Sequence, residues 1–338
     1  MRVAPLPAVL LALSAAGSAF AQPVDDTPSL WHPLRPSVTE FGDKIDALYW
    51  VVFWLTMIIL VIYQIALVYC AVRYRATEGG RAKFIHGNNK LEAAWTISPA
   101  IILVLLAAVS KGTWDEMRVD IPDDAVRIEC IAQQFAWFFR YPGEDGVFGP
   151  RDYEKLADMR AANDTSDAWA LDRETMPEGW EGEDPPGLDD YTIQGEIRVP
   201  ADRPVRILLT SNDVLHSFFL PEFRVKHDAV PGMNGGRVWF EVEWDDVKDR
   251  AYYDIVCAEL CGLNHYSMRG QLIVMKSGDI DPWVLDRTDD ELLEMRDFDD
   301  PEFAERVLSR NATWETYAHA MSRIAKAENS GGGGYDDY

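Results

Sequence analysis

Two long stretches without any charged residue are the strongest pattern along the chain. The first covers 47–72, 26 positions rich in Trp, Leu, Ile, Val and Tyr, and the second covers 93–110. At about 1.5 Å per residue, a helix over the first stretch is roughly 39 Å long, enough to cross a bilayer core of about 30 Å. Because a short polar loop at 73–92 joins the two stretches, we expect a transmembrane hairpin over 47–112 rather than a buried core helix.

The loop between the two stretches carries an excess of positive charge. Its five basic residues face two acidic ones: Arg73, Arg75, Arg81, Lys83 and Lys90 against Glu78 and Glu92. An excess of Lys and Arg marks the cytoplasmic side of a membrane protein. We therefore expect both ends of the mature chain on the outer side, which is the periplasm if the membrane is a bacterial inner membrane.

The first 21 residues have the pattern of a secretory signal peptide. Arg2 supplies a positive start, a mostly apolar run follows, and Ala19-Phe20-Ala21 has the small-x-small form of a cleavage site. The alternative is a first transmembrane helix, but the run is short and begins with prolines. Residues 22–46 would then form an extracytoplasmic segment before the hairpin.

After the second apolar stretch the pattern changes to short segments typical of strands. Seven of them are rich in Val, Ile, Phe, Tyr and Trp and are separated by Pro, Gly and Asp. This predicts a β-sandwich or small Greek-key barrel over 113–278. The seven segments are 125–131, 134–141, 196–200, 204–210, 236–244, 251–256 and 270–275.

Two acidic segments interrupt or follow the predicted strands. Residues 143–190 hold 15 acidic against 4 basic residues, and we interpret them as a surface insertion. Residues 279–338 hold 16 acidic against 6 basic residues and show helical spacing over 288–327. Two interpretations stay open for this charge: a solvated, solubilising surface, or a face that steers a basic partner.

The overall composition excludes some classes of protein. The chain has 338 residues, of which 48% are hydrophobic and 26% charged, an ordinary globular balance. Its net charge of −24 argues against a nucleic-acid binder, which would need a basic face. Four cysteines are too few for a disulfide scaffold.

Two thiols, an imidazole and a thioether lie within twelve residues, directly after a predicted strand. They are Cys257, Cys261, His265 and Met268. Soft sulfur ligands together with imidazole suit copper, and a second thiolate allows two copper ions to be bridged. A Cys257–Cys261 disulfide is one alternative, and zinc is another, although zinc would leave Met268 without a role.

Such a site needs a further imidazole from elsewhere in the chain. His216 follows a predicted strand inside the β-domain, and we choose it as this ligand, with His227 as the alternative. The remaining histidines fall before the first apolar stretch, in the basic loop and in the acidic tail: His32, His86 and His319.

These residues together resemble subunit II of the haem–copper cytochrome c oxidases along nearly the whole chain. Four ordered motifs carry the resemblance: Leu91-Glu92-Ala93-Ala94-Trp95-Thr96-Ile97-Ser98-Pro99-Ala100-Ile101-Ile102, Asp213-Val214-Leu215-His216-Ser217, Lys226-His227-Asp228-Ala229-Val230-Pro231-Gly232, and the Cys-x3-Cys-x3-His-x2-Met run. The resemblance implies a cupredoxin-like Greek-key β-barrel, anchored by the hairpin, with a binuclear CuA centre of two copper ions.

The resemblance also implies a role for each ligand. Cys257 and Cys261 would bridge the two coppers, and His216 and His265 would each cap one. Met268 would be a weak ligand to one copper.

In the same way, the resemblance implies roles for two acidic residues and for the partner subunits. The Glu259 backbone carbonyl would be a ligand to the other copper, and its carboxylate would reach a magnesium or manganese ion shared with subunit I. Glu92 matches an acidic residue near the cytoplasmic mouth of a proton pathway into subunit I. Haem would lie only in that partner, and subunit III would complete the complex.

The chain departs from the family where the incoming electron is usually accepted. The usual Gln-Trp-Tyr-Trp run is here Gln134-Phe135-Ala136-Trp137, so Phe135 replaces the tryptophan. Phe135 and Trp137 are our candidates for accepting the electron. The tail contains no Cys-x-x-Cys-His motif, so a separate c-type cytochrome would be the donor.

We therefore expect the electron-accepting subunit of a respiratory cytochrome c oxidase, which reduces oxygen to water and pumps protons. No catalytic residue is expected in this chain itself. Two alternatives remain: the CuA subunit of a nitric oxide reductase, and a non-enzymatic copper-binding or assembly protein. A quinol oxidase subunit is disfavoured because such chains lack the copper ligands.

Overall fold

The computed structural model describes residues 35–76, 79–81, 84, 86–150, 187–233, 236–247, 252–297, 300–309 and 312–331. The predicted signal peptide, most of the acidic insertion and the last seven residues lie outside these ranges. The chain divides into two compact units. One holds the long helices within Phe41–Asp120, and the other holds Ser37–Glu40 together with the residues from Ile121 onward.

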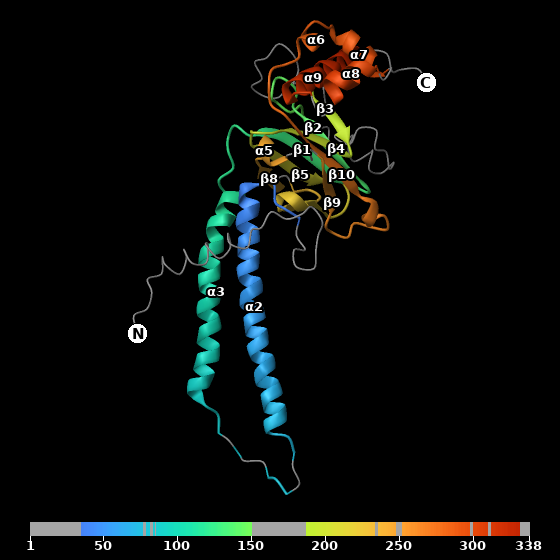
Figure 1. The fold of residues 1–338 in the computed structure, drawn as a ribbon. Coiled ribbons are helices and arrows are strands. Elements are labelled where there is room, and N and C mark those ends of the chain that lie inside the picture. Colours follow the sequence, from blue (N-terminus) through green and yellow to red (C-terminus); the bar gives the residue numbers. More distant parts are fainter. Residues whose placement is uncertain are drawn as a thin grey trace. The chain divides into compact units, whose positions relative to one another are not determined.

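Two long apolar helices form the first unit, α2 (Glu40–Arg73) and α3 (Asn89–Arg118) (Figure 1). Both are long and apolar enough to cross a membrane, and they contain the two predicted spans. Large apolar side chains such as Ile62 and Val104 are exposed along them. Lipid would cover such side chains, whereas exposing so much apolar surface to water would be unfavourable.

Both helices extend beyond the uncharged stretches. The α3 helix begins where the Asn88 side chain accepts hydrogen bonds from the first backbone N–H groups, and it ends eight residues past the predicted span. Its polar last turns include an ion pair between Lys111 and Asp115. A second ion pair, from Lys44 Nζ to Glu116 Oε1 at 2.7 Å, joins the two helices. The predicted hairpin boundary at residue 112 therefore falls inside a continuous helix.

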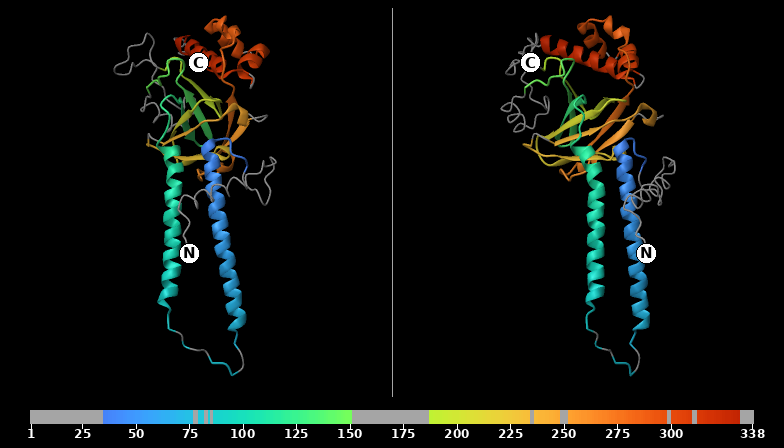
Figure 2. Two further views of the ribbon diagram at one scale, coloured as in Figure 1. Left: turned by 60° about the vertical axis from the view of Figure 1, so that its left-hand side comes forward. Right: turned by 90° about the vertical axis from the view of Figure 1, so that its left-hand side faces the viewer.

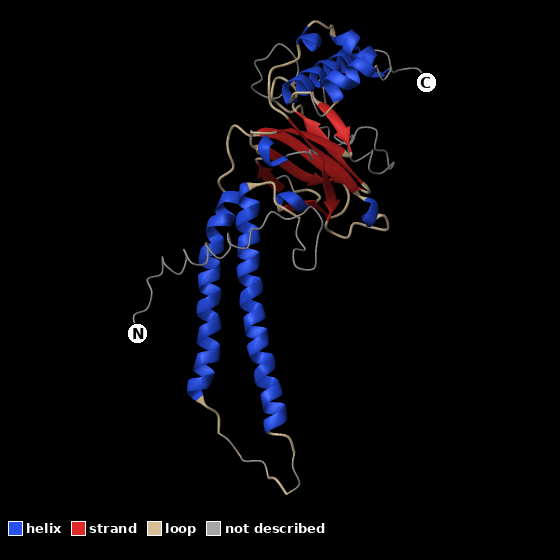
Figure 3. Cartoon of the chain, viewed as in Figure 1, coloured by secondary structure: helices blue, strands red, loops and turns tan. Residues whose placement is uncertain are grey.

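The second unit is built on two five-stranded sheets (Figure 3). One sheet has the order β3-β2-β1-β5-β8 and the other β4-β10-β9-β6-β7. The strands of the first sheet are β1 (Val126–Gln133), β2 (Ala136–Tyr141), β3 (Tyr191–Gln194), β5 (Val205–Ser211) and β8 (Gly236–Phe240). Those of the second are β4 (Glu196–Pro200), β6 (His216–Leu220), β7 (Val225–Ala229), β9 (Tyr252–Cys257) and β10 (Arg269–Met275).

Two pairs of strands, β1 with β5 and β4 with β10, run parallel, and the other pairs are antiparallel. Alternate residues of each strand point between the sheets, where side chains from both are fully buried. The largest include Trp137, Phe139, Phe218 and Phe240. Burying a side chain of this size contributes on the order of 2–3 kcal/mol. The predicted membrane-anchored β-fold is confirmed.

The sequence pattern predicts seven of these strands and misses three. The missed strands β3, β6 and β7 are four or five residues long, and polar residues break their apolar pattern. Two predicted segments are too long. Residues 134 and 135 form a turn before β2, and β8 ends at Phe240, before a short helix α5 (Trp244–Val247). That helix begins where the Asp202 carboxylate accepts a hydrogen bond from the Trp244 N–H.

The acidic tail folds against the sandwich instead of forming a separate part. Its helical segments are α6 (Pro282–Leu285), α7 (Asp289–Asp297), α8 (Pro301–Phe303), η3 (Ala304–Leu308) and α9 (Trp314–Gly331). In Figure 2 the red α9 helix lies against the sandwich in both views. The Tyr317 ring of α9 lies 6.2 Å from that of Tyr191 in β3, and the Arg198 guanidinium of β4 lies 4.9 Å from the Tyr317 ring. The predicted boundary at 278 thus divides elements that pack as one unit.

The described ends of the acidic insertion are also fixed to this unit. Arg140, which is almost fully buried in β2, donates from Nε to Asp190 Oδ2 at 2.9 Å and from an η nitrogen to Glu129 at 3.0 Å. Asp189 accepts a hydrogen bond from Ser322 of α9 at 3.1 Å. The point where the insertion leaves and rejoins the sheet therefore lies beside the tail.

Candidate metal centre

Two segments of the sandwich, the loop between β9 and β10 and the start of β6, bring the predicted ligands together. Cys257 is the last residue of β9, and Met268 directly precedes β10. Between them lie Cys261 and His265, the latter at the start of the short helix η2 (His265–Ser267). Because β9 and β10 pair up to Val256 and Arg269, both ends of this ligand loop are held in place.

Strand pairing also places the fourth ligand. His216 is the first residue of β6, which pairs with β9 so that Phe218 lies opposite Cys257. The Ala258 N–H donates to the Ser217 carbonyl at 2.9 Å and continues this pairing past the cysteine. The His216 ring therefore lies over the start of the ligand loop.

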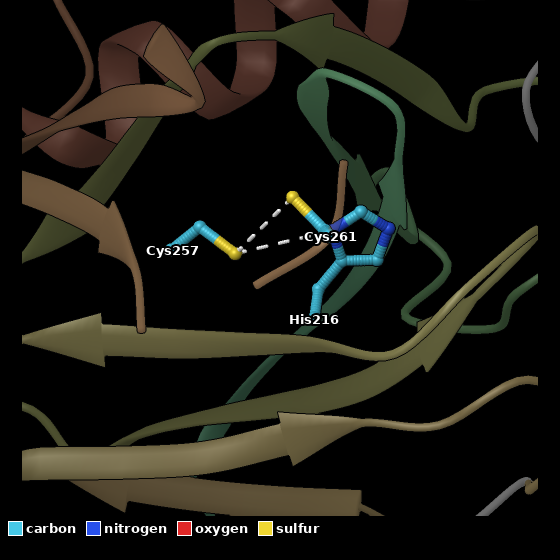
Figure 4. A group of neighbouring side chains, drawn as sticks. All are labelled: His216, Cys257 and Cys261. Atoms are coloured by element: carbon cyan, nitrogen blue, oxygen red, sulfur yellow. Dashed lines mark hydrogen bonds between the residues drawn. The ribbon is translucent and has the colours of Figure 1, made fainter. Parts of the chain in front are cut away.

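The donor atoms of His216, Cys257 and Cys261 form a compact group (Figure 4). The Cys257 and Cys261 sulfurs are 3.8 Å apart, and His216 Nδ1 lies 3.9 Å from the Cys257 sulfur. His265 Nδ1 lies 3.5 Å from the Cys261 sulfur. The Met268 sulfur is 3.8 Å from the Cys261 sulfur, and the Glu259 carbonyl oxygen is 3.2 Å from the Cys257 sulfur. Each thiol thus has one imidazole and one weaker donor beside it.

Most of these donors are shielded from water. His216 has no exposed surface, Met268 is 1% exposed, and both cysteines are buried. Among the side chains that would bind copper, His265 is partly exposed. A buried group of polar and sulfur atoms is costly unless each atom finds a partner, so a bound metal ion would stabilise this arrangement.

The pKa values of the two thiols are shifted in opposite directions by their surroundings. Burial raises the pKa of Cys257, but hydrogen bonds with His216 and the neighbouring backbone outweigh it and lower that pKa to about 6. Burial and the adjacent Cys257 raise the pKa of Cys261 to about 12. The pair therefore releases its first proton more readily than its second, and metal binding to both sulfurs displaces the remaining protons.

An acidic residue orients His216. The His216 Nε2 atom lies 2.8 Å from Asp213 Oδ1, which leaves Nδ1 facing the Cys257 sulfur. Burial lowers the pKa of His216, but the Asp213 hydrogen bond outweighs burial and the pKa is raised. A carboxylate on the outer nitrogen fixes the ring orientation of a metal-binding histidine.

The geometry favours copper bound by His216 and the two cysteines over a disulfide, over His227 as a ligand and over zinc. Cys257 and Cys261 are free thiols, not a disulfide. Among the described residues, a group with metal-binding spacing contains His216 with both cysteines, and His227 does not belong to it. His227 lies on β7, where its Nδ1 contacts the Asp228 carbonyl oxygen at 2.9 Å. The thioether of Met268 in direct contact with a thiol favours copper over zinc.

The candidates for accepting an electron occupy different environments. Trp137 is fully buried, and its ring is packed edge-on against His216 with centroids 6.2 Å apart. Phe135 is partly exposed in the β1–β2 turn. A Cβ at Gly262 would lie 3.0 Å from Phe135 Cζ, so this ring lies directly against the residue after Cys261.

The two acidic residues with predicted roles are both exposed. Glu259 lies in the ligand loop between the two cysteines, and Glu92 lies in the first turn of α3.

Two residues that support the site were not assigned a role from the sequence. Gln134 donates from its backbone N–H to Asp213 Oδ2 at 2.7 Å and from its side chain to the Cys261 carbonyl. Gly262 has a φ of +140° and leaves room for this contact. The sequence motifs that contain these two residues indicate the metal site. The contacts themselves join segments 79 and 127 positions apart, and a local sequence pattern does not reveal contacts over such separations.

Comparison with known proteins identifies the family. The family description "Cytochrome C oxidase subunit II, periplasmic domain" matches residues 167–277, and "Cytochrome C oxidase subunit II, transmembrane domain" matches residues 33–111. The alternative cytochrome c oxidase subunit 2 of Bradyrhizobium diazoefficiens is 33% identical over 278 residues, 82% of this chain and 90% of that protein. Cytochrome c oxidase subunit 2 of Thermostichus vulcanus is 28% identical, over 75% and 78% of the two chains.

Among solved structures, the periplasmic domain of subunit II of the cytochrome oxidase of Bradyrhizobium japonicum is similar, with 24% identity and a TM-score of 0.29. That match covers 46% of this chain and 88% of the other. The two apolar helices and the transmembrane family match together indicate a membrane-anchored protein. The family implies a copper centre of the CuA type, and the group of His216 with the two cysteines is compatible with it. The chain belongs to the cytochrome c oxidase subunit II family and is part of a haem–copper oxidase complex.

Proposed function

We propose that this chain accepts electrons from a c-type cytochrome at a binuclear copper centre and passes them to haem in subunit I, where oxygen is reduced to water. The observation that carries the proposal is the pair of cysteine sulfurs 3.8 Å apart, each with an imidazole Nδ1 within 4 Å. A mononuclear blue-copper site would need only one thiolate. Two thiolates with one imidazole each suit two equivalent copper ions.

Each of the six predicted ligands has a place in this proposal. Cys257 and Cys261 would bridge the two ions, and His216 and His265 would cap one each. Met268 and the backbone carbonyl of Glu259 would be the weak ligands. When bound, the copper pair supplies a one-electron carrier that shares its charge over two metals.

The chain itself supplies a rigid and largely dry site. His216 is fully buried and Met268 almost fully buried, so packing restricts the movement of both side chains. The strand pairing of Val256 with Arg269 limits movement of the ligand loop. A site whose ligands move little on reduction needs little reorganisation, which favours rapid electron transfer.

For electron acceptance we propose Phe135 as the surface group. Its ring lies against Gly262, next to Cys261, and it is partly exposed. Trp137 is fully buried against His216, so its ring would act behind the surface. Exposed apolar residues of the same loops, Leu260, Leu263 and Tyr266, support a contact surface for a protein partner around the site.

Two acidic residues are proposed to act in the assembled complex. The exposed Glu259 carboxylate would bind magnesium or manganese together with subunit I. Glu92, in the first turn of α3 on the side of the basic loop, would serve proton uptake into subunit I. Subunit III would complete the complex.

We further propose that the anchor spans a bacterial inner membrane and that the metal centre lies on the periplasmic side. The basic loop between the helices supports this orientation because such loops stay in the cytoplasm.

Copper stoichiometry and electron paramagnetic resonance of the purified oxidase complex test the proposal. The native complex is expected to show hyperfine structure shared over two copper nuclei, and Cys257→Ser is expected to abolish that signal and to lose two copper ions relative to the native complex. Cys130→Ala is the matched control, because Cys130 is a buried free thiol in β1 that does not belong to the group of His216 with the two cysteines. A signal from one copper nucleus, or a Cys257–Cys261 disulfide without copper, would contradict the proposal.

A further inference from the structure

The β1–β2 turn joins the segment before His216 to the part of the ligand loop around Cys261, which the β6–β9 pairing does not reach. From Gln134, the backbone N–H donates to Asp213 Oδ2 at 2.7 Å, and Asp213 Oδ1 lies 2.8 Å from His216 Nε2. The Gln134 side chain also donates from Nε2 to the Cys261 carbonyl. One residue therefore holds the His216 loop with its main chain and the cysteine loop with its side chain.

Strand pairing holds Cys257 but does not extend to Cys261. Cys257 is fixed by the β6–β9 pairing and by its N–H, which donates to the Met268 carbonyl at 3.3 Å. Cys261 lies four residues further on, outside any strand. Among the described residues, Gln134 supplies the one hydrogen bond to its carbonyl.

Gly262, next to Cys261, allows close contact between the β1–β2 turn and the ligand loop. A Cβ at position 262 would lie 2.7 Å from Gln134 Nε2, closer than Cβ atoms come to other atoms, and 3.0 Å from Phe135 Cζ, a tight contact. Gly262 also has a φ of +140°, which other residues rarely adopt. The approach of the Gln134 amide to the Cys261 peptide thus requires a residue without a side chain.

We propose that Gln134 is a positioning residue that sets the distance between the His216 segment and the Cys261 segment of the copper centre. The inference rests on the proposed binuclear site. His216 and Cys261 belong to different segments, and equal sharing of an electron requires that their relative position does not vary. Without the Gln134 amide, Cys261 could shift relative to Cys257 and His216, and the two copper positions would become unequal.

The test compares Gln134→Met with native protein in the purified oxidase complex. Methionine keeps the length of the side chain and the backbone N–H, but it cannot donate to the Cys261 carbonyl. Two copper ions should remain, while the hyperfine structure becomes unequal over the two nuclei. Electron uptake from a small-molecule reductant should slow about tenfold, the size expected for the loss of one hydrogen bond.

Two further variants make the test specific. Gln134→Glu also removes the donor and places an acceptor opposite the carbonyl, so it should have a larger effect. Gln194→Met is the matched control, because Gln194 is exposed at the end of β3, and it should match native protein. A native spectrum in Gln134→Met with slower reaction toward the cytochrome donor alone would overturn the inference and make Gln134 a contact residue. Absence of a two-copper signal in native protein would instead contradict the proposed function.

Discussion

At the scale of single residues, Asp213 determines which nitrogen of His216 faces the thiols. Its carboxylate holds Nε2 and accepts hydrogen bonds from two backbone N–H groups, those of Gln134 and Val214. We expect Asp213→Ala to lower copper affinity about 10- to 100-fold, because the ring would lose the partner that orients it. Competition with a copper chelator measures this.

The control for that prediction is Asp254→Ala, which removes an exposed carboxylate from β9 of the same sheet. It should leave copper affinity unchanged. If Asp213→Ala also bound copper with native affinity, packing alone would hold His216, and the carboxylate would have no orienting role.

Asp145 is expected to make stability depend on pH. Partial burial and the neighbouring carboxylates Asp189 and Asp190 raise its pKa from 3.8 to about 6. Between these values the folded chain holds a proton that the unfolded chain releases, so this group destabilises the fold progressively as pH rises from about 4 to about 6. Asp145→Asn should therefore raise the melting temperature at pH 7 more than at pH 4, as thermal unfolding would show.

The control here is Asp254→Asn, an exposed carboxylate of the same unit, which should change the melting temperature equally at both pH values. An equal effect of Asp145→Asn at pH 4 and pH 7 would show that its ionisation is not linked to folding.

At the scale of elements, the aromatic contact between α9 and the sandwich holds the tail. The Tyr317 ring is 1% exposed and contacts Tyr191, Trp314 and Arg198. We expect Tyr317→Ala to destabilise this contact by about 3–5 kcal/mol and to expose the tail to proteases. The copper signal should persist, because the tail follows the end of β10 opposite to the ligand loop. Limited proteolysis followed by spectroscopy checks both.

Two control variants separate the ring from other effects. Tyr317→Phe should be nearly neutral, since the buried hydroxyl finds no hydrogen-bond partner among the described residues. Leu285→Ala in α6 should also be mild, because this side chain is 54% exposed. Loss of the copper signal in Tyr317→Ala would mean that the tail supports the metal centre.

At the scale of the whole molecule, the unit boundary predicts which fragments are soluble. A fragment covering 121–331 keeps both sheets and the tail, and it should remain in solution without detergent and bind two copper ions. A fragment covering 121–278 would expose Tyr141, Tyr191 and the Arg198 stem, which α9 covers, and it should aggregate. Size-exclusion chromatography distinguishes the two, and a monomeric, stable 121–278 fragment would contradict the shared core.

The sequence by itself was sufficient for the features that local pattern encodes. The two uncharged stretches predict the membrane helices, because a bilayer core requires about 20 apolar residues in succession. The close spacing of Cys257, Cys261, His265 and Met268 predicts a site for soft metals, because a single loop can bring all four donors together. These motifs also carried the family assignment, which the comparisons confirm.

Only the tertiary structure decided how distant segments cooperate. The short strand β6 has too few apolar residues to be predicted, yet its pairing with β9 places His216 beside Cys257. The tail has the composition of a solvated surface, but burial of Tyr317 makes it part of the sandwich core. Gln134 contacts Cys261 across 127 positions. Such contacts depend on the packing of the complete fold, so no local pattern of charge or hydrophobicity encodes them.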